Sequence, residues 1–176
     1  LIYMNDWLAE TFQLRLTVSE TAIRPDLREV TDASYIDPLT GELVNGNPDV
    51  VPSSVESIDV RAEWFFENGN SFTVSLFNKE IDNPIEFFES PASDTNTARE
   101  IVNAAETSIN GVEIDGLLSL GTIVDWGDQF FVQGNATFQD SETIAGTQAD
   151  SPTSAKREAT GASDYVVNIM FGFDST

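Results

Sequence analysis

Residues 55–79 read VESIDVRAEWFFENGNSFTVSLFNK and alternate apolar with polar side chains on both sides of the pair Asn68-Gly69. Successive side chains of a β-strand point to opposite faces, so this alternation predicts strands with one apolar and one polar face. Asn and Gly both tolerate positive φ, as short hairpin turns require. The segment therefore predicts a tight antiparallel hairpin whose apolar face carries Ile58, Val60, Ala62, Trp64, Phe66, Phe72, Val74 and Leu76.

The same alternation recurs along most of the chain, and it predicts an all-β antiparallel meander of about seven long strands. Further strands are predicted within residues 12–19, 111–120, 130–139 and 165–174. Helical periodicity is not convincing anywhere. Residues 95–106 lack a clean apolar stripe, so we expect one short helix or a loop there.

Long and short connections take turns between the predicted strands. The long ones cover residues 20–54, 89–104 and 143–162, and the short ones cover 67–70 and 121–128. Two architectures fit this pattern: a secreted β-sandwich and an outer-membrane barrel with apolar side chains facing lipid. Alternations of about ten residues, together with short turns on one side only, favour the barrel.

Composition excludes several classes of function. The 176 residues include 30 acidic and 8 basic side chains, for a net charge of −22, and no His or Cys. Catalytic triads with His, thiol nucleophiles and zinc fingers are therefore excluded, and the negative field argues against nucleic acid as a partner. No pair of carboxylates is singled out for catalysis, so we expect no enzyme activity, no cofactor and no metal site.

Several runs closely resemble the barrel of TonB-dependent outer-membrane receptors. They are RLTVSETAIRPDLREV (15–30), YIDPLTGELVNGNPDVVPSSVESIDVRAEWFF (35–66), FTVSLFNKEIDNPIE (72–86), AAETSINGVEIDGLLSL (104–120) and SDYVVNIMFGFD (163–174). The combination of RPDLRE with GNPD is far more specific than alternation alone. The resemblance covers nearly the whole chain in order.

The resemblance implies a 22-stranded barrel in the Gram-negative outer membrane, plugged by an N-terminal domain and energised through TonB. Residues 1–176 would then be a fragment of the C-terminal part of the barrel, without the plug and the terminal strands. Its partners would be that plug, the remaining strands, TonB, lipid and a small-molecule cargo such as an iron chelate or an oligosaccharide. The alternative is a soluble, secreted, acidic β-sandwich that binds carbohydrate.

Two sets of candidate site residues follow. Tyr35, Asp37 and Asp49 lie in the long connection 20–54, where external loops of such receptors help to capture cargo. Arg15, Arg61 and Glu63 lie on the polar strand face and are expected to face the lumen or the plug, where pairing avoids an isolated buried charge.

Other motifs have simpler readings. Arg24-Pro25-Asp26 and Asn45-Gly46-Asn47-Pro48 are expected to shape turns, because Pro fixes φ and Gly tolerates positive φ. Acidic residues in the predicted loops, which include Asp94, Asp140, Glu142 and Asp150, show no calcium-binding spacing and are expected to be solvated. Aromatic residues could form interfacial girdles, with Trp126 and Tyr165 the best placed among Tyr3, Trp7, Tyr35, Trp64, Trp126 and Tyr165.

Overall fold

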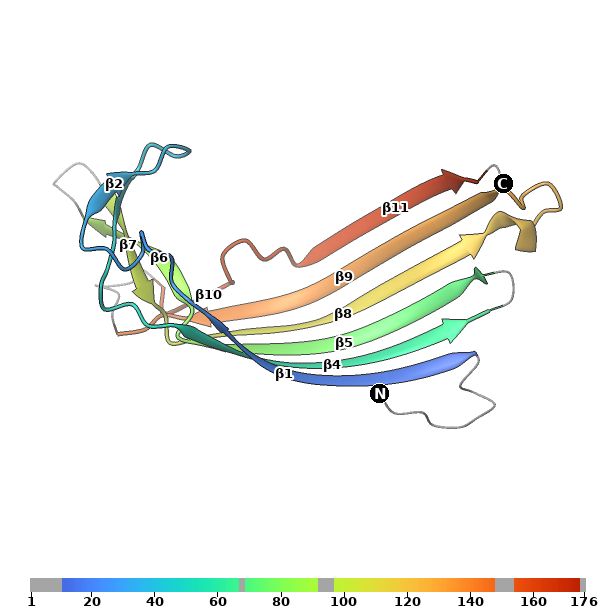
Figure 1. The fold of residues 1–176 in the computed structure, drawn as a ribbon, viewed down its shortest axis with the longest axis horizontal. Helices are drawn as coiled ribbons and strands as arrows, with labels where there is room; N and C mark the ends of the chain where they lie inside the picture. Colours follow the sequence, from blue (N-terminus) through green and yellow to red (C-terminus); the bar gives the residue numbers. More distant parts are fainter. Residues whose placement is uncertain (1–10, 67–68, 92–96, 148–153, 175–176) are drawn as a thin grey trace.

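The computed structural model describes residues 11–66, 69–91, 97–147 and 154–174. Its main body is a seven-stranded antiparallel sheet in which each long strand pairs with the next long strand along the chain (Figure 1). The long strands are β1 (Phe12–Ile23), β4 (Ser53–Phe65), β5 (Ser71–Asp82), β8 (Glu106–Ser119), β9 (Phe130–Ile144) and β11 (Tyr165–Phe173). The predicted antiparallel meander is confirmed. The seventh member of the sheet, β10 (Lys156–Arg157), has only two residues.

The predicted hairpin at residues 55–79 is present as β4 and β5. Trp64 lies opposite Phe72, and Val60 lies opposite Leu76, so the apolar positions of the two strands meet on one face. In the connection, Gly69 has φ +77°, the left-handed conformation that favours glycine. Asn68 lies outside the described residues.

The long connections contain a second, four-stranded sheet that the sequence did not predict. Its strands pair in the order β2 (Ser34–Ile36), β3 (Leu43–Asn45), β7 (Thr97–Asn103) and β6 (Ile85–Pro91), and the β3–β7 pair is parallel. This small sheet lies at one end of the main sheet (Figure 1). The opposite end carries the short connections, including the 3₁₀ turn Leu120–Thr122. We call these the long-loop end and the short-turn end.

The expectation of a short helix or loop at residues 95–106 is wrong for the part that the structure describes. Residues 97–103 form β7, and β8 begins at Glu106. Strand β7 pairs along its whole length with β6, and its side chains Ala98, Ile101 and Val102 are buried. Tertiary pairing has therefore overridden a weak local pattern.

The buried apolar residues of the described chain gather at the long-loop end. They are Val44, Val50, Ala98, Ile101, Val102 and Ala104, and they belong to the small sheet or its connections. Asn103 fastens this region, because its side chain accepts from the Val51 N–H at 2.8 Å and donates to the Asn83 carbonyl at 2.7 Å. None of the described residues belongs to a helix long and apolar enough to cross a membrane.

Candidate functional site

The register of the main sheet places one polar residue from each long strand at the same level. Each of these residues pairs with the corresponding residue of the neighbouring strand. In strand order they are Gln13, Glu63, Thr73, Asp115, Asn135 and Asn168. The row ends in a direct contact, in which Asn168 Nδ2 donates to Asn135 Oδ1 at 2.9 Å. Because side chains alternate, all six lie on one face of the sheet, which we call the polar face.

The two faces of the sheet have the opposite exposure to that of a soluble protein. On the polar face, Glu63 is 7% exposed and Ser75 is 2% exposed, whereas Val18, Leu76 and Ile169 on the apolar face are 70%, 57% and 77% exposed. A β-sandwich would cover such a face with a second sheet. Here the small sheet sits at one end instead (Figure 1). The sandwich alternative is therefore wrong, and the arrangement is that of a barrel wall.

Arg15, Arg61 and Glu63 form one charge cluster on the polar face. Arg15 pairs directly with Arg61 in the register of β1 and β4. The Glu63 carboxylate lies between them, with Oε2 3.1 Å from Arg15 Nη2 and Oε1 2.9 Å from Arg61 Nε. Arg15 also donates to Gln13 Oε1 at 2.9 Å. The structure thus brings the three residues together, and their orientation toward a lumen or plug stays a prediction.

The three loop residues predicted to contact cargo have different surroundings. Tyr35 is half-buried on β2 and lines an open pocket of about 410 Å³, to which neither of the other two contributes. Asp37 Oδ1 accepts the N–H of Leu39 at 2.7 Å, so this carboxylate holds a turn. Asp49 is exposed. Ligand contact by any of the three stays a prediction.

The RPDLRE and GNPD segments lock together. Glu29 Oε2 accepts the Asp26 N–H at 2.6 Å, which is the reciprocal contact of a capping box. The Asn47 N–H donates to the Glu29 carbonyl at 2.7 Å. A Cβ added to Gly46 would lie 2.1 Å from the Thr31 carbonyl oxygen, so only glycine fits there. These contacts give both motifs a conformational role, but the expected positive φ at Gly46 is wrong: the positive-φ glycines of the described residues are Gly41, Gly69 and Gly161, and Gly46 is required by close approach instead.

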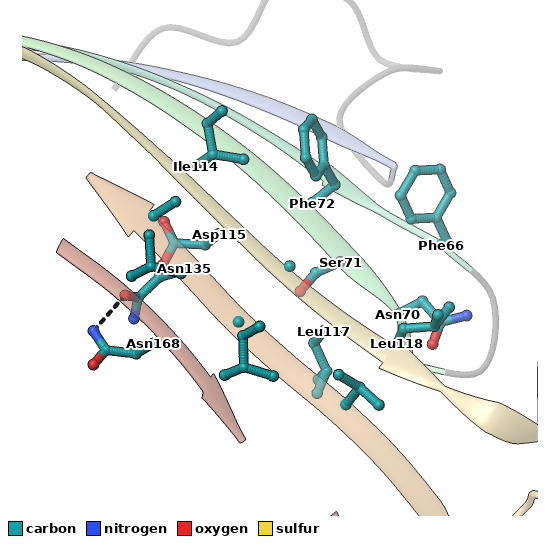
Figure 2. A pocket seen from close by; sticks show the side chains of 16 residues that line it. Phe66, Asn70, Ser71, Phe72, Ile114, Asp115, Leu117, Leu118, Asn135 and Asn168 are labelled. Atoms are coloured by element: carbon teal, nitrogen blue, oxygen red, sulfur yellow. Dashed lines mark hydrogen bonds between the residues drawn. The ribbon is translucent and has the colours of Figure 1, made fainter. Parts of the chain in front are cut away.

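An open apolar groove of about 730 Å³ crosses the apolar face near its short-turn end (Figure 2). Gly116 and Gly134 pair with each other across β8 and β9 and leave a gap between larger side chains. Phe66 and Phe72 lie on one side of the groove and Leu118 near its end (Figure 2). Asp115, which the register places on the polar face, is the ionisable residue among those that line the groove. The groove is part of the exposed surface described above.

Aromatic rings cluster at the short-turn end of the apolar face. Trp64 packs between Phe12 and Phe72, with ring centroids 5.1 and 5.9 Å away, and Trp126 contacts Phe130 at 6.1 Å. Tyr165 is the first residue of β11 and pairs with Phe138, in the middle of β9. The role of these three rings in a girdle stays a prediction.

Two of the other proposed girdle residues, Tyr3 and Trp7, lie outside the described residues. Tyr35 belongs to the small sheet, where it packs against the Val44, Val50 and Ile101 cluster, so the structure contradicts a girdle role for it.

Within the described residues, the acidic side chains form no group of three that could hold a metal ion. Of the residues considered for calcium, Asp94 and Asp150 lie outside this part of the chain. Glu142 forms an ion pair of 2.7 Å with Lys156.

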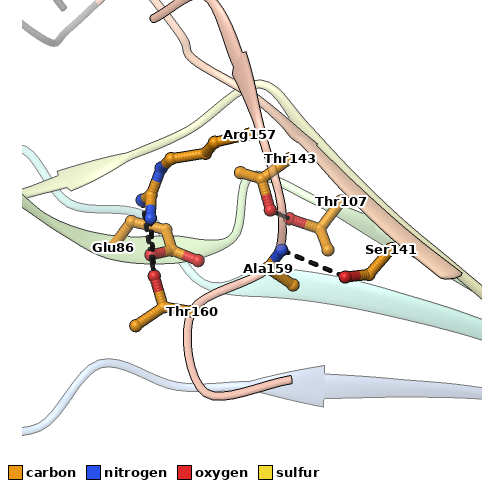
Figure 3. Close-up of polar contacts among 7 residues, drawn as sticks. All are labelled: Glu86, Thr107, Ser141, Thr143, Arg157, Ala159 and Thr160. Atoms are coloured by element: carbon orange, nitrogen blue, oxygen red, sulfur yellow. Dashed lines mark hydrogen bonds and ion pairs between the residues drawn. The ribbon is translucent and has the colours of Figure 1, made fainter. Parts of the chain in front are cut away.

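The long-loop end carries a polar cluster that no sequence pattern predicted (Figure 3). Arg157 Nη2 donates to Glu86 Oε2 at 2.9 Å, and Thr160 Oγ1 donates to the same oxygen at 3.0 Å. Glu86 and Arg157 are 71 positions apart, so no local spacing could have indicated the pair.

Comparison with known proteins agrees with this geometry. A family model described as "TonB dependent receptor-like, beta-barrel" matches residues 1–175. The crystal structure of the siderophore receptor PirA from Pseudomonas aeruginosa is similar, with a TM-score of 0.66 and 14% sequence identity, over 96% of this chain and 29% of that chain. PirA from Acinetobacter baumannii gives a TM-score of 0.58 and 15% identity, over 99% of this chain and 25% of that chain. This chain thus spans less than a third of either receptor. Comparison with curated proteins gives no match.

Proposed function

Because this chain belongs to the TonB-dependent receptor β-barrel family, we propose that it is part of the wall of an outer-membrane receptor that imports a scarce nutrient. The remaining strands, a plug domain and the segment that contacts TonB would be supplied by other parts of the protein. The family is one of receptors and transporters, so we assign the chain no catalytic role.

The exposure of the two sheet faces is the observation that carries this proposal. An apolar face with Leu76 at 57% exposure would be unstable in water but suits contact with hydrocarbon, while the polar face suits a wet interior. The long strands have 9 to 15 residues, and a tilted membrane strand needs about 9 to 11. Both features support insertion in a bilayer.

We propose an iron chelate as the first cargo to test and an oligosaccharide as the second. The iron chelate is supported by the two similar structures, which carry the name siderophore receptor. Their identity to this chain is 14% and 15%, so the support comes from shared architecture.

The two sets of candidate residues have different roles in this proposal. The Arg15, Arg61 and Glu63 cluster would face the lumen and contact the plug. A plug that covers these side chains removes them from water, and their ion pairs avoid the cost of an unpaired buried charge. Tyr35, Asp37 and Asp49 would belong to the external surface. Tyr35 is the best placed to touch cargo, because it lines a pocket.

The first test is the location of the full-length gene product, expressed with its signal. We expect it in the outer-membrane fraction, with gel migration that shifts on heating as folded barrels do. A product that is soluble in the periplasm or the medium would overturn the proposal.

The second test is uptake. Cells that carry the full-length gene should accumulate a labelled ferric chelate or a labelled oligosaccharide, and deletion of tonB should abolish the accumulation. Equal accumulation with and without TonB would contradict energised transport.

A further inference from the structure

Residues 154–162, which include β10, fold back onto the polar face as a short strap that precedes β11. Arg157 pairs with Thr143 on β9, and Tyr165 pairs with Phe138, so the strap bulges out of an otherwise regular edge. A turn closes it, with the Ala162 N–H donating to the Ala159 carbonyl at 3.1 Å and Gly161 at φ +78°. This positive φ favours glycine at the tip.

The strap covers part of the polar face at the long-loop end. The Ala159 N–H donates to Ser141 Oγ at 3.1 Å, and Gln139 Nε2 donates to the Ser163 carbonyl at 3.0 Å. Between the strap and the sheet lies a cavity of about 380 Å³, lined by Ile81, Ile109 and Ala159 among others. The strap therefore narrows the polar side of the sheet at that end.

One carboxylate fastens the strap to the small sheet (Figure 3). Glu86 Oε2 accepts hydrogen bonds from Arg157 Nη2 and Thr160 Oγ1, and the Glu86 side chain is 12% exposed. Arg157 also lies over the Phe88 ring, 5.2 Å from its centroid. A charge-assisted contact of this kind is stronger than an exposed ion pair.

The other contacts of the strap are polar. Its strand β10 pairs with Ile144 and Thr143 of β9, Lys156 forms an ion pair of 2.7 Å with Glu142, and the Ala145 N–H donates to the Ala155 carbonyl at 2.9 Å. Its residues Ser154, Lys156, Glu158, Thr160 and Gly161 are exposed. Segments with few buried apolar contacts open at low free energy without unfolding the rest of the protein. The strap is thus held by exposed polar contacts and by the partly buried Glu86–Arg157 pair, the combination expected of a part that opens as a unit.

We propose that residues 154–162 are a movable strap, fastened by Glu86 and Arg157, that must leave the polar face for cargo to pass. This inference rests on the proposed function, because it assumes that cargo moves along the polar face. It adds a specific moving part and a specific fastening to that function.

The test is a reversible disulfide in the full-length receptor, helped by the absence of cysteine from this chain. Ser141→Cys with Ala159→Cys would join the strap to β9, where the Ala159 N–H already contacts the Ser141 side chain at 3.1 Å. The matched control, Thr107→Cys with Thr143→Cys, would join two paired strands beneath the strap, where the hydroxyl oxygens are 2.8 Å apart.

We expect the oxidised strap disulfide to lower the rate of TonB-dependent uptake about tenfold and reduction to restore it, with little effect of the control disulfide. Unchanged uptake with the strap disulfide fully formed would overturn the proposal that the strap must move. Uptake by the unmodified receptor would still support the proposed function. Equal losses with both disulfides would also overturn the strap proposal. Absence of TonB-dependent uptake by the unmodified receptor would instead refute the proposed function.

Discussion

Arg15 lies directly opposite Arg61 in the pairing of β1 with β4, and the two guanidinium groups share the carboxylate of Glu63. Like charges placed opposite each other destabilise a sheet, so the pair depends on that carboxylate. Glu63 has 9% of its side chain exposed, whereas the side chains of Arg15 and Arg61 are 46% and 34% exposed. The acid is thus the least hydrated member of the cluster.

Glu63→Gln should destabilise the receptor by about 1–2 kcal/mol, less than a fully buried pair would lose, because both arginines stay partly hydrated. Glu113→Gln is the matched control, since Glu113 lies on the same face and has no ion pair among the described residues. The measurement is the urea midpoint of the folded full-length receptor in liposomes. Equal midpoints for the two variants would mean that the cluster contributes nothing.

Gly46→Ala should disrupt the junction of the RPDLRE and GNPD segments. The added Cβ would lie 2.1 Å from the Thr31 carbonyl oxygen and 2.7 Å from that of Arg28, so backbone must move, at a cost of about 1–3 kcal/mol. Gly41→Ala is the control for backbone strain alone, because φ +72° strains alanine there although nothing lies within 4 Å of the added Cβ. Limited proteolysis of the receptor should cut the Gly46→Ala loop faster. Equal cleavage of both variants would argue against a locked junction.

Two glycines of β8 should respond in opposite directions to alanine. At Gly116 the nearest atom to an added Cβ is the Ser71 carbonyl oxygen at 3.9 Å, so the methyl fits and should stabilise by about 0.5–1 kcal/mol. At Gly111 the Cβ would meet the Phe77 ring at 2.4 Å and should destabilise by about 1–3 kcal/mol. The temperature of the heat-induced gel shift measures both changes. A shift of the same sign for both would contradict the packing described here.

The two ion pairs near the strap should differ in strength. Glu86→Gln should release Arg157 and speed tryptic cleavage after it, because the Glu86 side chain is 12% exposed and holds two strap residues. Glu142→Gln removes the Lys156 partner, where the side chains are 62% and 45% exposed, and should change stability by less than about 0.5 kcal/mol. Faster cleavage in the Glu142 variant than in the Glu86 variant would reverse our ranking.

Spin labels at single cysteines would test the depth of the apolar face in the bilayer. Labels at Trp126, in the connection between β8 and β9, and at Tyr165, the first residue of β11, should sit at headgroup level if both rings belong to interfacial girdles. A label at Leu76, which is 57% exposed on the apolar face, should sit in hydrocarbon. The depth of each label in the reconstituted receptor is measured by its accessibility to oxygen and to a water-soluble nickel chelate. Equal access of the chelate at all three positions would rule out a membrane-facing surface.

The sequence by itself determined the long strands of the main sheet and their faces. Alternation is local, so the positions of Val60, Trp64 and Leu76 on one face could be predicted without knowing any partner strand. The turn chemistry of Gly69 was equally local, because φ belongs to a single residue. The close approach of Gly46 to Thr31 and Arg28 was not, because it joins segments 15 and 18 positions apart. The family resemblance rested on such local runs as well.

Only the tertiary structure decided which strands and loops meet. The parallel β3–β7 pair, the Arg15–Arg61 juxtaposition and the Glu86–Arg157 contact all depend on the register between distant segments, which single-sequence periodicity does not carry. Residues 97–103 became a strand because β6 offered them a pairing edge and a buried face. Alternation also left open whether the apolar face is covered, and its exposure was settled by where the small sheet packs.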